Sequence, residues 1–250
     1  TVIGIIVLAS CLLPLPTYAA SLKAVENPHC FAILEGQIGV GDYEKIKGEI
    51  EAILPPRFAD DGGLPDVPIA ICLNSPGGSI PSAVKLAEFF WGNQIGTVID
   101  ANASCLSACS LIFMMGTEDY SDFNILHRKM HISGTLGFHR PSLKLAIGQD
   151  YTSAQVEKSF EIAIDSTLFF LELANRQVSE GAGPMLAVDL LENMFSHRSQ
   201  DFFYIDTVDK AGRWDVQIFG YEPPPTISLR EAQTACDNGV NWTMNLTSKG

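Results

Sequence analysis

Basic residues are scarce in this chain of 250 residues: 16 lysines and arginines stand against 29 aspartates and glutamates, a formal net charge of −13 at pH 7. Binding to nucleic acid needs clustered lysine and arginine side chains to neutralise phosphates. Attraction to an anionic membrane surface needs the same clusters. The composition therefore argues against both kinds of partner, and it gives no positive indication of a substrate.

One apolar run has the length of a targeting segment, residues 1–20 (TVIGIIVLASCLLPLPTYAA). An apolar stretch followed by prolines and by a small-x-small triplet is typical of a secretory signal peptide, although no basic residue precedes it and the sequence starts with Thr1. We expect a signal peptide over residues 1–19, cleavage after Ala19, and export to the periplasm or the extracellular space. An uncleaved membrane anchor and a lipoprotein lipidated at Cys11 are the alternatives, and the run is short for a membrane span.

Cysteines are few, and neither they nor the histidines show zinc-like spacing, so we expect no bound metal. We expect no cofactor either. Without the signal peptide five remain, at positions 30, 72, 105, 109 and 236. Export would permit disulfides, and an odd number leaves at least one thiol free. Cys105 and Cys109 are one helical turn apart, so a bridge between them requires a distorted helix start. The sequence leaves the pairing open.

Hydrophobic residues make up 46% of the chain, which is ample for a packed core. Apolar runs typical of strands alternate with amphipathic helical patterns, an order that predicts an α/β fold of right-handed βαβ units with a mostly parallel sheet. Ligands of such sheets bind at the carboxyl ends of the strands. The predicted strands are 30–35, 67–73, 95–99, 202–205 and 216–219, and the predicted helices are 43–54, 82–90, 108–115, 153–177, 185–194 and 228–236.

Two segments at predicted strand ends have features of anion-binding sites. Residues 74–78 (NSPGG) end a buried strand and lead into a helix, and the two glycines let backbone N–H groups approach a ligand closely. Residues 103–109 (ASCLSAC) lead into an apolar helix that we expect to begin near Ser107. The Ser107 hydroxyl is either an N-cap or a nucleophile at a helix N-terminus, which stabilises negative charge. Four other serines are weaker candidates, with expected roles in turns, caps or packing: Ser75, Ser79, Ser104 and Ser110.

A serine hydroxyl needs a base to become a good nucleophile. The best candidate is His139, which ends a short apolar run in LGFHRP. Such a histidine is either structural or catalytic, and a serine partner favours the catalytic role. His127 and His131 are competing bases, within a polar segment (residues 120–131) that we expect to be an exposed excursion.

These motifs, in this order, resemble the proteolytic subunit of Clp protease and the wider group of ClpP/crotonase-fold serine peptidases, which includes signal peptide peptidase A. The closest resemblance is to exported Clp-protease-like proteins that carry a CxSAC segment. It covers about residues 28–216. It implies a ClpP/crotonase-like domain over residues 28–220, built of repeated β-β-α and βαβ units with a mostly parallel sheet, and a C-terminal tail over residues 221–250.

The resemblance also implies roles for individual residues. Ser107 would be the nucleophile, His139 the general base, and the backbone N–H groups of Gly78 and Ala108 the oxyanion hole. The third member of the triad would be Asp201, in SQDFF. Asp206 and Asp209 are the fallback positions for that acid.

The function expected from the resemblance is that of a serine-type endopeptidase acting on peptides or unfolded protein segments. A homo-oligomer is expected, without an ATPase partner outside the cytoplasm. In the Clp family the helix that corresponds to residues 153–177 packs between subunits; packing on its own domain is the other interpretation.

Two departures from the family pattern keep other functions open. The segment 117–134 is longer than the usual link between helix and histidine strand, and cysteines flank Ser107. The main alternative is a catalytically inactive binding or assembly protein with the same fold. A further alternative, crotonase-type chemistry on acyl thioesters, would not need Ser107.

Overall fold

The structure is a computed structural model that describes residues 19–57, 68–120, 123–142, 148–178, 183–198, 200–222 and 225–243. The expected signal peptide lies outside the described residues except for Ala19. None of the helices in the described segments has both the length and the apolar character needed to cross a membrane.

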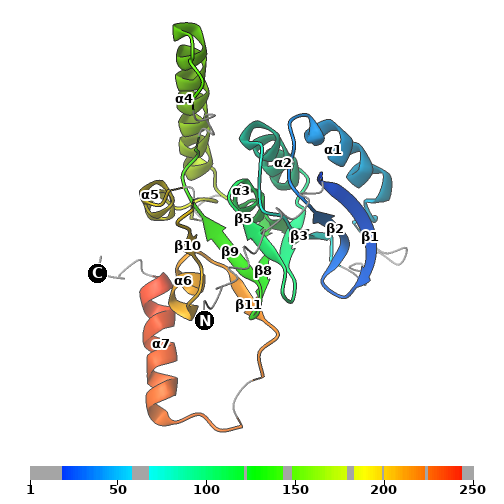
Figure 1. Ribbon diagram of the computed structural model, residues 1–250. Coiled ribbons are helices and arrows are strands. Elements are labelled where there is room, and N and C mark those ends of the chain that lie inside the picture. The colour runs from blue at the N-terminus through cyan, green and yellow to red at the C-terminus, as the bar shows by residue number, and fades with distance from the viewer. Residues whose placement is uncertain are drawn as a thin grey trace, which may run out of the picture.

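A six-stranded sheet runs through the centre of the described residues (Figure 1). Neighbouring strands pair in parallel, except that β1 runs antiparallel to β2. The predicted α/β fold with a mostly parallel sheet is therefore confirmed. In spatial order the strands are β1 (Ser21–Asn27), β2 (Cys30–Glu35), β3 (Ala70–Asn74), β4 (Gly96–Ile99), β8 (Arg128–His131) and β11 (Gln217–Phe219).

A smaller sheet adjoins the first and has the order β10 (Phe203–Tyr204), β9 (Thr135–Phe138), β5 (Ser104–Leu106). Strand β9 pairs in parallel with β5 and antiparallel with β10. A bridge between Ser75 and Cys105 connects the segment after β3 with β5. The two sheets are thus joined where β3 ends.

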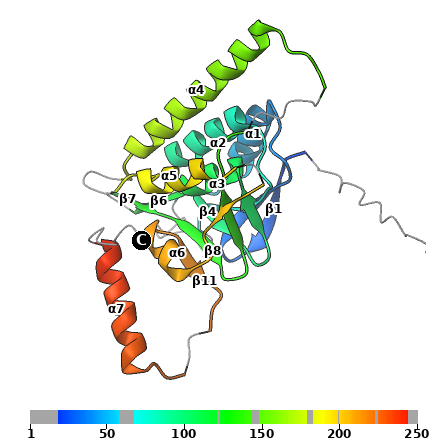
Figure 2. The ribbon, with the colours of Figure 1, turned by 60° about the vertical axis from the view of Figure 1, so that its left-hand side comes forward.

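The described residues contain seven helices: α1 (Asp42–Ile53), α2 (Ile80–Gly92), α3 (Ala108–Met114), α4 (Ser153–Asn175), α5 (Val188–Ser196), α6 (Val208–Arg213) and α7 (Leu229–Thr243). Helices α1, α2 and α3 lie together on one face of the large sheet (Figures 1 and 2). Helix α4 projects away from the sheets. Helix α7 lies beside α6, away from the large sheet.

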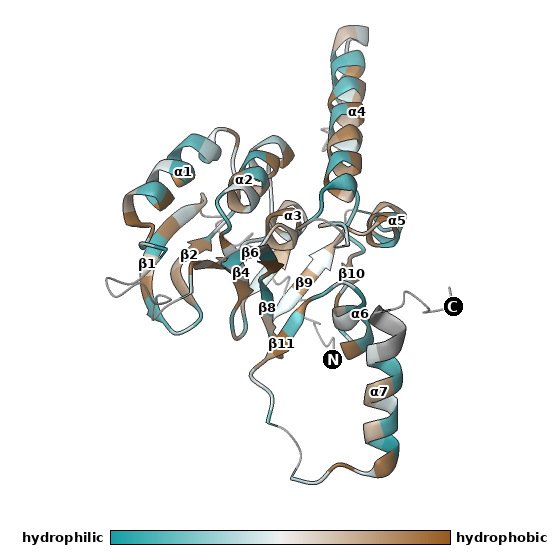
Figure 3. Cartoon of the chain, turned by 180° about the vertical axis from the view of Figure 1, so that it is seen from behind, coloured by the Kyte–Doolittle hydropathy of each residue, from teal (hydrophilic) through white to brown (hydrophobic). Residues whose placement is uncertain are grey.

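The main core lies between the large sheet and the helices α1, α2 and α3. Every residue of α3 is buried, and α2 buries Leu86 and Phe90 against it. Figure 3 shows hydrophobic residues in α3, hydrophilic residues in β8, and a mixture of the two along the projecting α4. The apolar sides of α2 and α3 therefore pack on the large sheet and cover it.

Strand β1 was not predicted from the sequence. The residues of β1 (SLKAVEN) are half-buried or exposed, and such a sequence gives only a weak strand signal. Pairing with β2 stabilises the strand. The large sheet consequently begins at Ser21, before the expected domain start at residue 28.

The expectation that residues 120–131 form an exposed excursion is wrong. Thr117–Tyr120 (β6) and Phe123–Leu126 (β7) form a hairpin, and β8 then enters the large sheet between β4 and β11. Arg128, in this strand, is only 2% exposed. A strand with this many charged residues is typical of a protein surface. The burial of β8 follows from its pairing with β4 and β11, which the local sequence does not indicate.

Arg128 has an unusual environment for a charged residue. Its guanidinium donates hydrogen bonds to the Met185 carbonyl (3.1 Å) and to the Met114 sulfur (3.6 Å). Burial lowers the pKa of Arg128 to about 10, although the nearby charge of Asp215 favours the protonated form. The side chain links β8 to α3 and to the segment before α5.

Candidate active site

The three segments singled out in the sequence meet at one end of the strands that carry them. Ser75 follows β3 and pairs with β5: its N–H donates to the Ser104 carbonyl (2.7 Å), and its own carbonyl accepts from Leu106 N–H (3.0 Å). Strand β5 in turn pairs with β9. The carboxyl ends of β3, β5 and β9 therefore bring the NSPGG turn, Ser107 and His139 together.

Ser107 occupies the sharp turn between β5 and α3. Its backbone angles are φ 57° and ψ −125°, and positive φ is uncommon for a residue other than glycine. Such a conformation costs about 1–3 kcal/mol and persists only where the surroundings hold it. The Ser107 N–H donates to the Gly137 carbonyl (3.0 Å), and its C=O accepts from Ser110 N–H (2.9 Å). The Ser107 side chain makes no capping hydrogen bond, so its hydroxyl does not serve as an N-cap of α3.

His139 directly follows β9 and faces Ser107. Its Nε2 lies 2.7 Å from Ser107 Oγ, so that the hydroxyl can donate a hydrogen bond to the imidazole. Both residues are half-buried. The ring of Phe202 stands edge-on to the imidazole, with ring centroids 4.6 Å apart. A hydroxyl in this position can lose its proton to the imidazole as its oxygen attacks an electrophilic carbon.

The NSPGG turn packs against the Ser107 turn through its main chain. Gly77 has φ +88° and Gly78 has φ +143°. A Cβ on Gly77 would lie 2.8 Å from the Ala108 nitrogen, and one on Gly78 would lie 2.1 Å from the Ile38 carbonyl oxygen. Both positions thus require glycine, for conformation and for space.

The loop after β2 holds the NSPGG turn in place. Ile38 N–H donates to the Gly77 carbonyl (2.9 Å), and Ser79 N–H donates to the Ile38 carbonyl (2.8 Å). The Gly77 N–H donates to Ser75 Oγ (3.1 Å). These bonds fix the turn on both sides of Gly78.

The N–H groups of Gly78 and Ala108 are the main-chain donors proposed from the sequence. Within the described part of the chain, neither donates a backbone hydrogen bond outside the regular elements. Ala108 is the first residue of α3, where an N–H has no acceptor in its own helix. Both groups can therefore bind an anionic oxygen from a ligand.

The four weaker serine candidates have the turn, cap and packing roles expected of them. Ser79 caps α2, where its Oγ accepts from Ser82 N–H (3.4 Å). Ser75 and Ser110 are buried, and their hydroxyls bind the Gly77 N–H and the Ser107 carbonyl respectively. Ser104 lies in β5, and its N–H donates to Asn74 Oδ1 (3.1 Å).

Asp201 directly precedes Phe202, whose ring packs on His139, and its side chain is exposed. Its N–H donates to the Arg198 carbonyl (2.7 Å). Phe202, the next residue, is the one that packs on the imidazole. The role of Asp201 as third member of the triad stays a prediction.

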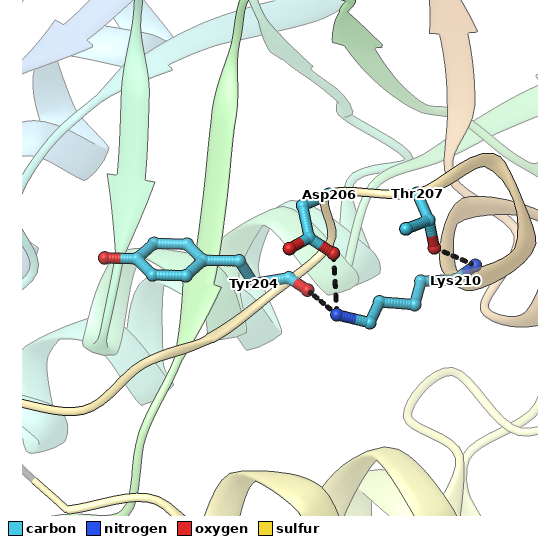
Figure 4. Close-up of polar contacts among 4 residues, drawn as sticks. All are labelled: Tyr204, Asp206, Thr207 and Lys210. Atoms are coloured by element: carbon cyan, nitrogen blue, oxygen red, sulfur yellow. Dashed lines mark hydrogen bonds and ion pairs between the residues drawn. The ribbon is translucent and has the colours of Figure 1, made fainter. Parts of the chain in front are cut away.

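The fallback Asp206 is engaged elsewhere, as Figure 4 shows. Its Oδ1 accepts from Lys210 Nζ (2.6 Å), which also donates to the Tyr204 carbonyl (2.9 Å). The hydrogen bond from Lys210 lowers the pKa of Asp206. The other fallback, Asp209, lies in the first turn of α6.

The two competing histidines bind other partners. His127 is 3% exposed, and its Nδ1–H donates to Glu118 Oε2 (2.7 Å), a bond that lowers the pKa of Glu118. His131 Nδ1 lies 2.8 Å from Ser133 Oγ. His139 is therefore the histidine that the structure places beside Ser107.

Four of the five cysteines are paired. Cys30 is bonded to Cys72, Cys105 to Cys109, and Cys236 is free and exposed. A Cys105–Cys109 bridge cannot form within a regular helix start. Here Cys105 lies in β5 and Cys109 lies in α3, and the turn at Ser107 between them brings the two cysteines together. In the described segments, no group of three or more His, Cys, Asp or Glu side chains is arranged to hold a metal.

Sequence reasoning missed two contributors to the site, Ile38 and Phe202. Ile38 lies in the loop between β2 and α1, and its contact with Gly77 is made across 39 residues of chain. Phe202 was placed in a predicted strand, but its contact with His139 depends on the pairing of β10 with β9.

A comparison of the chain with protein-family models finds no match, and neither does a comparison with curated proteins.

Proposed function

We propose that this protein is an exported serine hydrolase of the ClpP/crotonase-fold group that cleaves peptide bonds with Ser107 and His139. The observation that carries the proposal is the 2.7 Å contact between Ser107 Oγ and His139 Nε2 in a turn whose backbone is held at positive φ. A simple N-cap would need neither the imidazole nor that conformation.

In the proposed reaction, His139 Nε2 takes the hydroxyl proton while Ser107 Oγ attacks the substrate carbonyl carbon. The carbonyl oxygen becomes an anion that accepts hydrogen bonds from the N–H groups of Gly78 and Ala108. His139 then gives its proton to the leaving amine, and a water molecule hydrolyses the acyl-enzyme. Loss of one such donor typically costs about 2.7–4 kcal/mol of transition-state stabilisation.

The order of elements supports the ClpP/crotonase-like assignment. Two strands followed by a helix recur as β1-β2-α1, β4-β5-α3 and β8-β9-α4, with β3-α2 between the first two. The resemblance predicts such repeated β-β-α units. The choice of a peptide over another acyl substrate rests on the resemblance.

Export is supported by the two disulfides, Cys30–Cys72 and Cys105–Cys109. Disulfides persist in oxidising compartments and are rare in the cytosol. A protein in such a compartment has no ATP-driven unfoldase to feed it, so the proposed substrates are peptides and unfolded segments.

A homo-oligomer is supported by α4. Five exposed apolar side chains, at intervals of three and four residues, form one face of this helix: Val156, Phe160, Ile164, Leu168 and Leu171. The same face favours the second candidate function, an assembly protein without catalysis, because such a protein would need this surface and no triad.

Labelling with a fluorophosphonate probe tests the proposal, because such probes modify activated serines. The purified mature chain should label, and Ser107→Ala and His139→Ala should abolish or strongly reduce labelling. The chain provides a matched control in Ser133 and His131, a second hydrogen-bonded serine–histidine pair (2.8 Å) without the glycine turn. Ser133→Ala and His131→Ala should label like the wild type.

Folded wild-type protein that does not label would favour the assembly function instead. Labelling that survives Ser107→Ala would overturn the assignment of the site. Circular dichroism of each variant establishes that it is folded before its labelling is compared.

A further inference from the structure

The Cys105–Cys109 disulfide spans the turn that carries Ser107. Cys105 lies in β5, Cys109 lies in the first turn of α3, and Ser107 stands midway between them. Both cysteines are 0% exposed. The bond therefore lies beneath the candidate nucleophile and does not contact solvent.

The bond limits how far the turn can open. The Cα atoms of Cys105 and Cys109 are 5.2 Å apart. Five consecutive residues in extended conformation would place those atoms about 13–14 Å apart. With the bond in place, Ser107 and Ala108 have little freedom to leave the sharp turn between strand and helix.

The two ends of the bond are anchored unequally. On the β5 side, Cys105 is held in the small sheet by its pairing with Leu136 and with Ser75. On the α3 side, the helix has seven residues, and its N-cap residue Ser107 makes no capping hydrogen bond. The disulfide is thus a second covalent connection, besides the chain itself, between the start of α3 and the sheet.

Ser107 needs such a connection because its backbone is strained. Its φ of 57° lies in a region that residues with a Cβ rarely adopt. One backbone hydrogen bond, from Ser107 N–H to the Gly137 carbonyl (3.0 Å), holds the residue to β9. If the turn relaxed, this bond, the Oγ–Nε2 contact with His139 and the direction of the Ala108 N–H would change together.

We propose that the Cys105–Cys109 disulfide is the device that positions Ser107 and the Ala108 N–H for catalysis, so that the site is competent only when the bond is closed. This inference rests on the proposed hydrolase function and adds a redox requirement to it. The cysteines themselves do not touch substrate, and their role is to position other groups.

Closure of the bond has a definite balance. Two thiols lose two protons and two electrons by thiol–disulfide exchange with a disulfide donor, which leaves as a dithiol. A chain that folds in a reducing compartment would keep the thiols and a relaxed turn. The hydrolase would then become competent after transfer to an oxidising compartment.

The second disulfide provides a matched control. Cys30–Cys72 joins β2 to β3 and belongs to a separate small cluster of buried residues with Ala70 and Val98. In the Cys30→Ala/Cys72→Ala variant, Cys105–Cys109 is the disulfide that remains among the described residues. Oxidised and reduced forms of that variant then differ at the Ser107 turn alone.

The experiment measures the rate of fluorophosphonate labelling at Ser107 in folded, oxidised protein. Cys105→Ala/Cys109→Ala should label about tenfold to a hundredfold more slowly than wild type, because small displacements of reacting groups cost factors of this size. The oxidised Cys30→Ala/Cys72→Ala variant should label like wild type, and its form refolded in the presence of a small dithiol should be as slow as the Cys105→Ala/Cys109→Ala variant. The pH profile of labelling should keep its shape, since His139 remains the base.

Amide hydrogen exchange over residues 104–111 gives a readout that does not need activity. Exchange at Ser107 should speed up when the Cys105–Cys109 bond is removed, because the bond to Gly137 then opens more often. Equal labelling in the folded Cys105→Ala/Cys109→Ala variant would overturn the inference and leave the hydrolase intact. Wild-type protein that does not label would overturn the hydrolase, and unchanged exchange at Ser107 would then overturn the positioning role as well.

Discussion

The Ser107 turn leaves no room for a side chain at Gly77. A Cβ on Gly77 would lie 2.8 Å from Ser107 Cβ and 2.5 Å from the Leu106 carbonyl oxygen. The two turns of the candidate site therefore fit together only because residue 77 has no side chain.

Gly77→Ala should destabilise the protein and abolish fluorophosphonate labelling. The alanine would have to adopt φ +88° at a cost of about 1–3 kcal/mol, and its methyl group would push the Ser107 turn away. Urea unfolding and labelling of the folded fraction measure the two effects.

The control for this substitution is Gly48→Ala in the middle of α1, where a Cβ meets nothing within 4 Å. Alanine there should raise the free energy of unfolding by about 0.5–1 kcal/mol and leave labelling unchanged. Normal labelling of Gly77→Ala would contradict the close fit between the two turns.

Asp201→Ala should reduce labelling by less than about tenfold, which corresponds to about 1.4 kcal/mol of transition-state stabilisation. The reason is that the Asp201 side chain is exposed, where solvent screens its charge. His139→Ala should reduce labelling by about 10²–10⁴-fold, the usual contribution of a general base.

Asp206→Ala is the companion variant, because its carboxylate binds Lys210 instead of the site. It should label like wild type. A loss in Asp201→Ala as large as that in His139→Ala would instead make Asp201 the residue that orients the imidazole.

Substitution of the exposed apolar face of α4 should convert an oligomer into smaller species. Phe160→Ser/Leu168→Ser removes two large side chains that are 67% and 54% exposed on that face. Sedimentation velocity of the wild type and of the variant gives the change in mass.

Ile162→Ser is the control for this face, since Ile162 is 47% exposed but lies on the opposite side of α4. It should leave the oligomer unchanged. A wild-type chain that sediments as a monomer at every concentration would contradict the proposed assembly.

Acidification should weaken the hairpin of β6 and β7 through Glu118. Its hydrogen bond from His127 lowers the pKa of the folded carboxyl below its unfolded value, so the stabilisation is present above the unfolded pKa and is lost as the pH falls through the folded pKa. Glu118→Gln should therefore lose less stability than wild type between about pH 6 and about pH 3.

The expected difference for Glu118→Gln is below about 1 kcal/mol, because the Glu118 side chain is 36% exposed and solvent screens the pair. Urea unfolding at each pH measures it. Glu26→Gln, an exposed position in β1, serves as the control and should follow wild type. Identical pH dependence in Glu118→Gln would mean that the pair contributes nothing to stability.

Local pattern was enough to predict much of the fold and the centre of the site. The buried run before NSPGG, the apolar helix after Ser107 and the short run before His139 each signal one strand or helix end, and parallel strands place such ends at one edge. The Ser107–His139 contact follows from that arrangement.

What could not be predicted depends on contacts between distant segments. Arg128 is buried because Met185 and Met114 surround its guanidinium, and no local pattern indicates those partners. The same holds for Phe202, whose place beside His139 follows from an antiparallel pairing with a strand 65 residues away, Phe203 with Phe138.

The position of Ala108 as the first residue of α3 makes it possible to remove one main-chain N–H by ordinary mutagenesis. Proline is well tolerated at this helical position, since its fixed φ suits the helix and the missing N–H has no helical acceptor to lose. Ala108→Pro would thus erase one proposed oxyanion donor while the Ser107 and His139 side chains stay in the chain. The contribution of a main-chain N–H to the reaction, which side-chain substitutions do not reach, can be measured in this way.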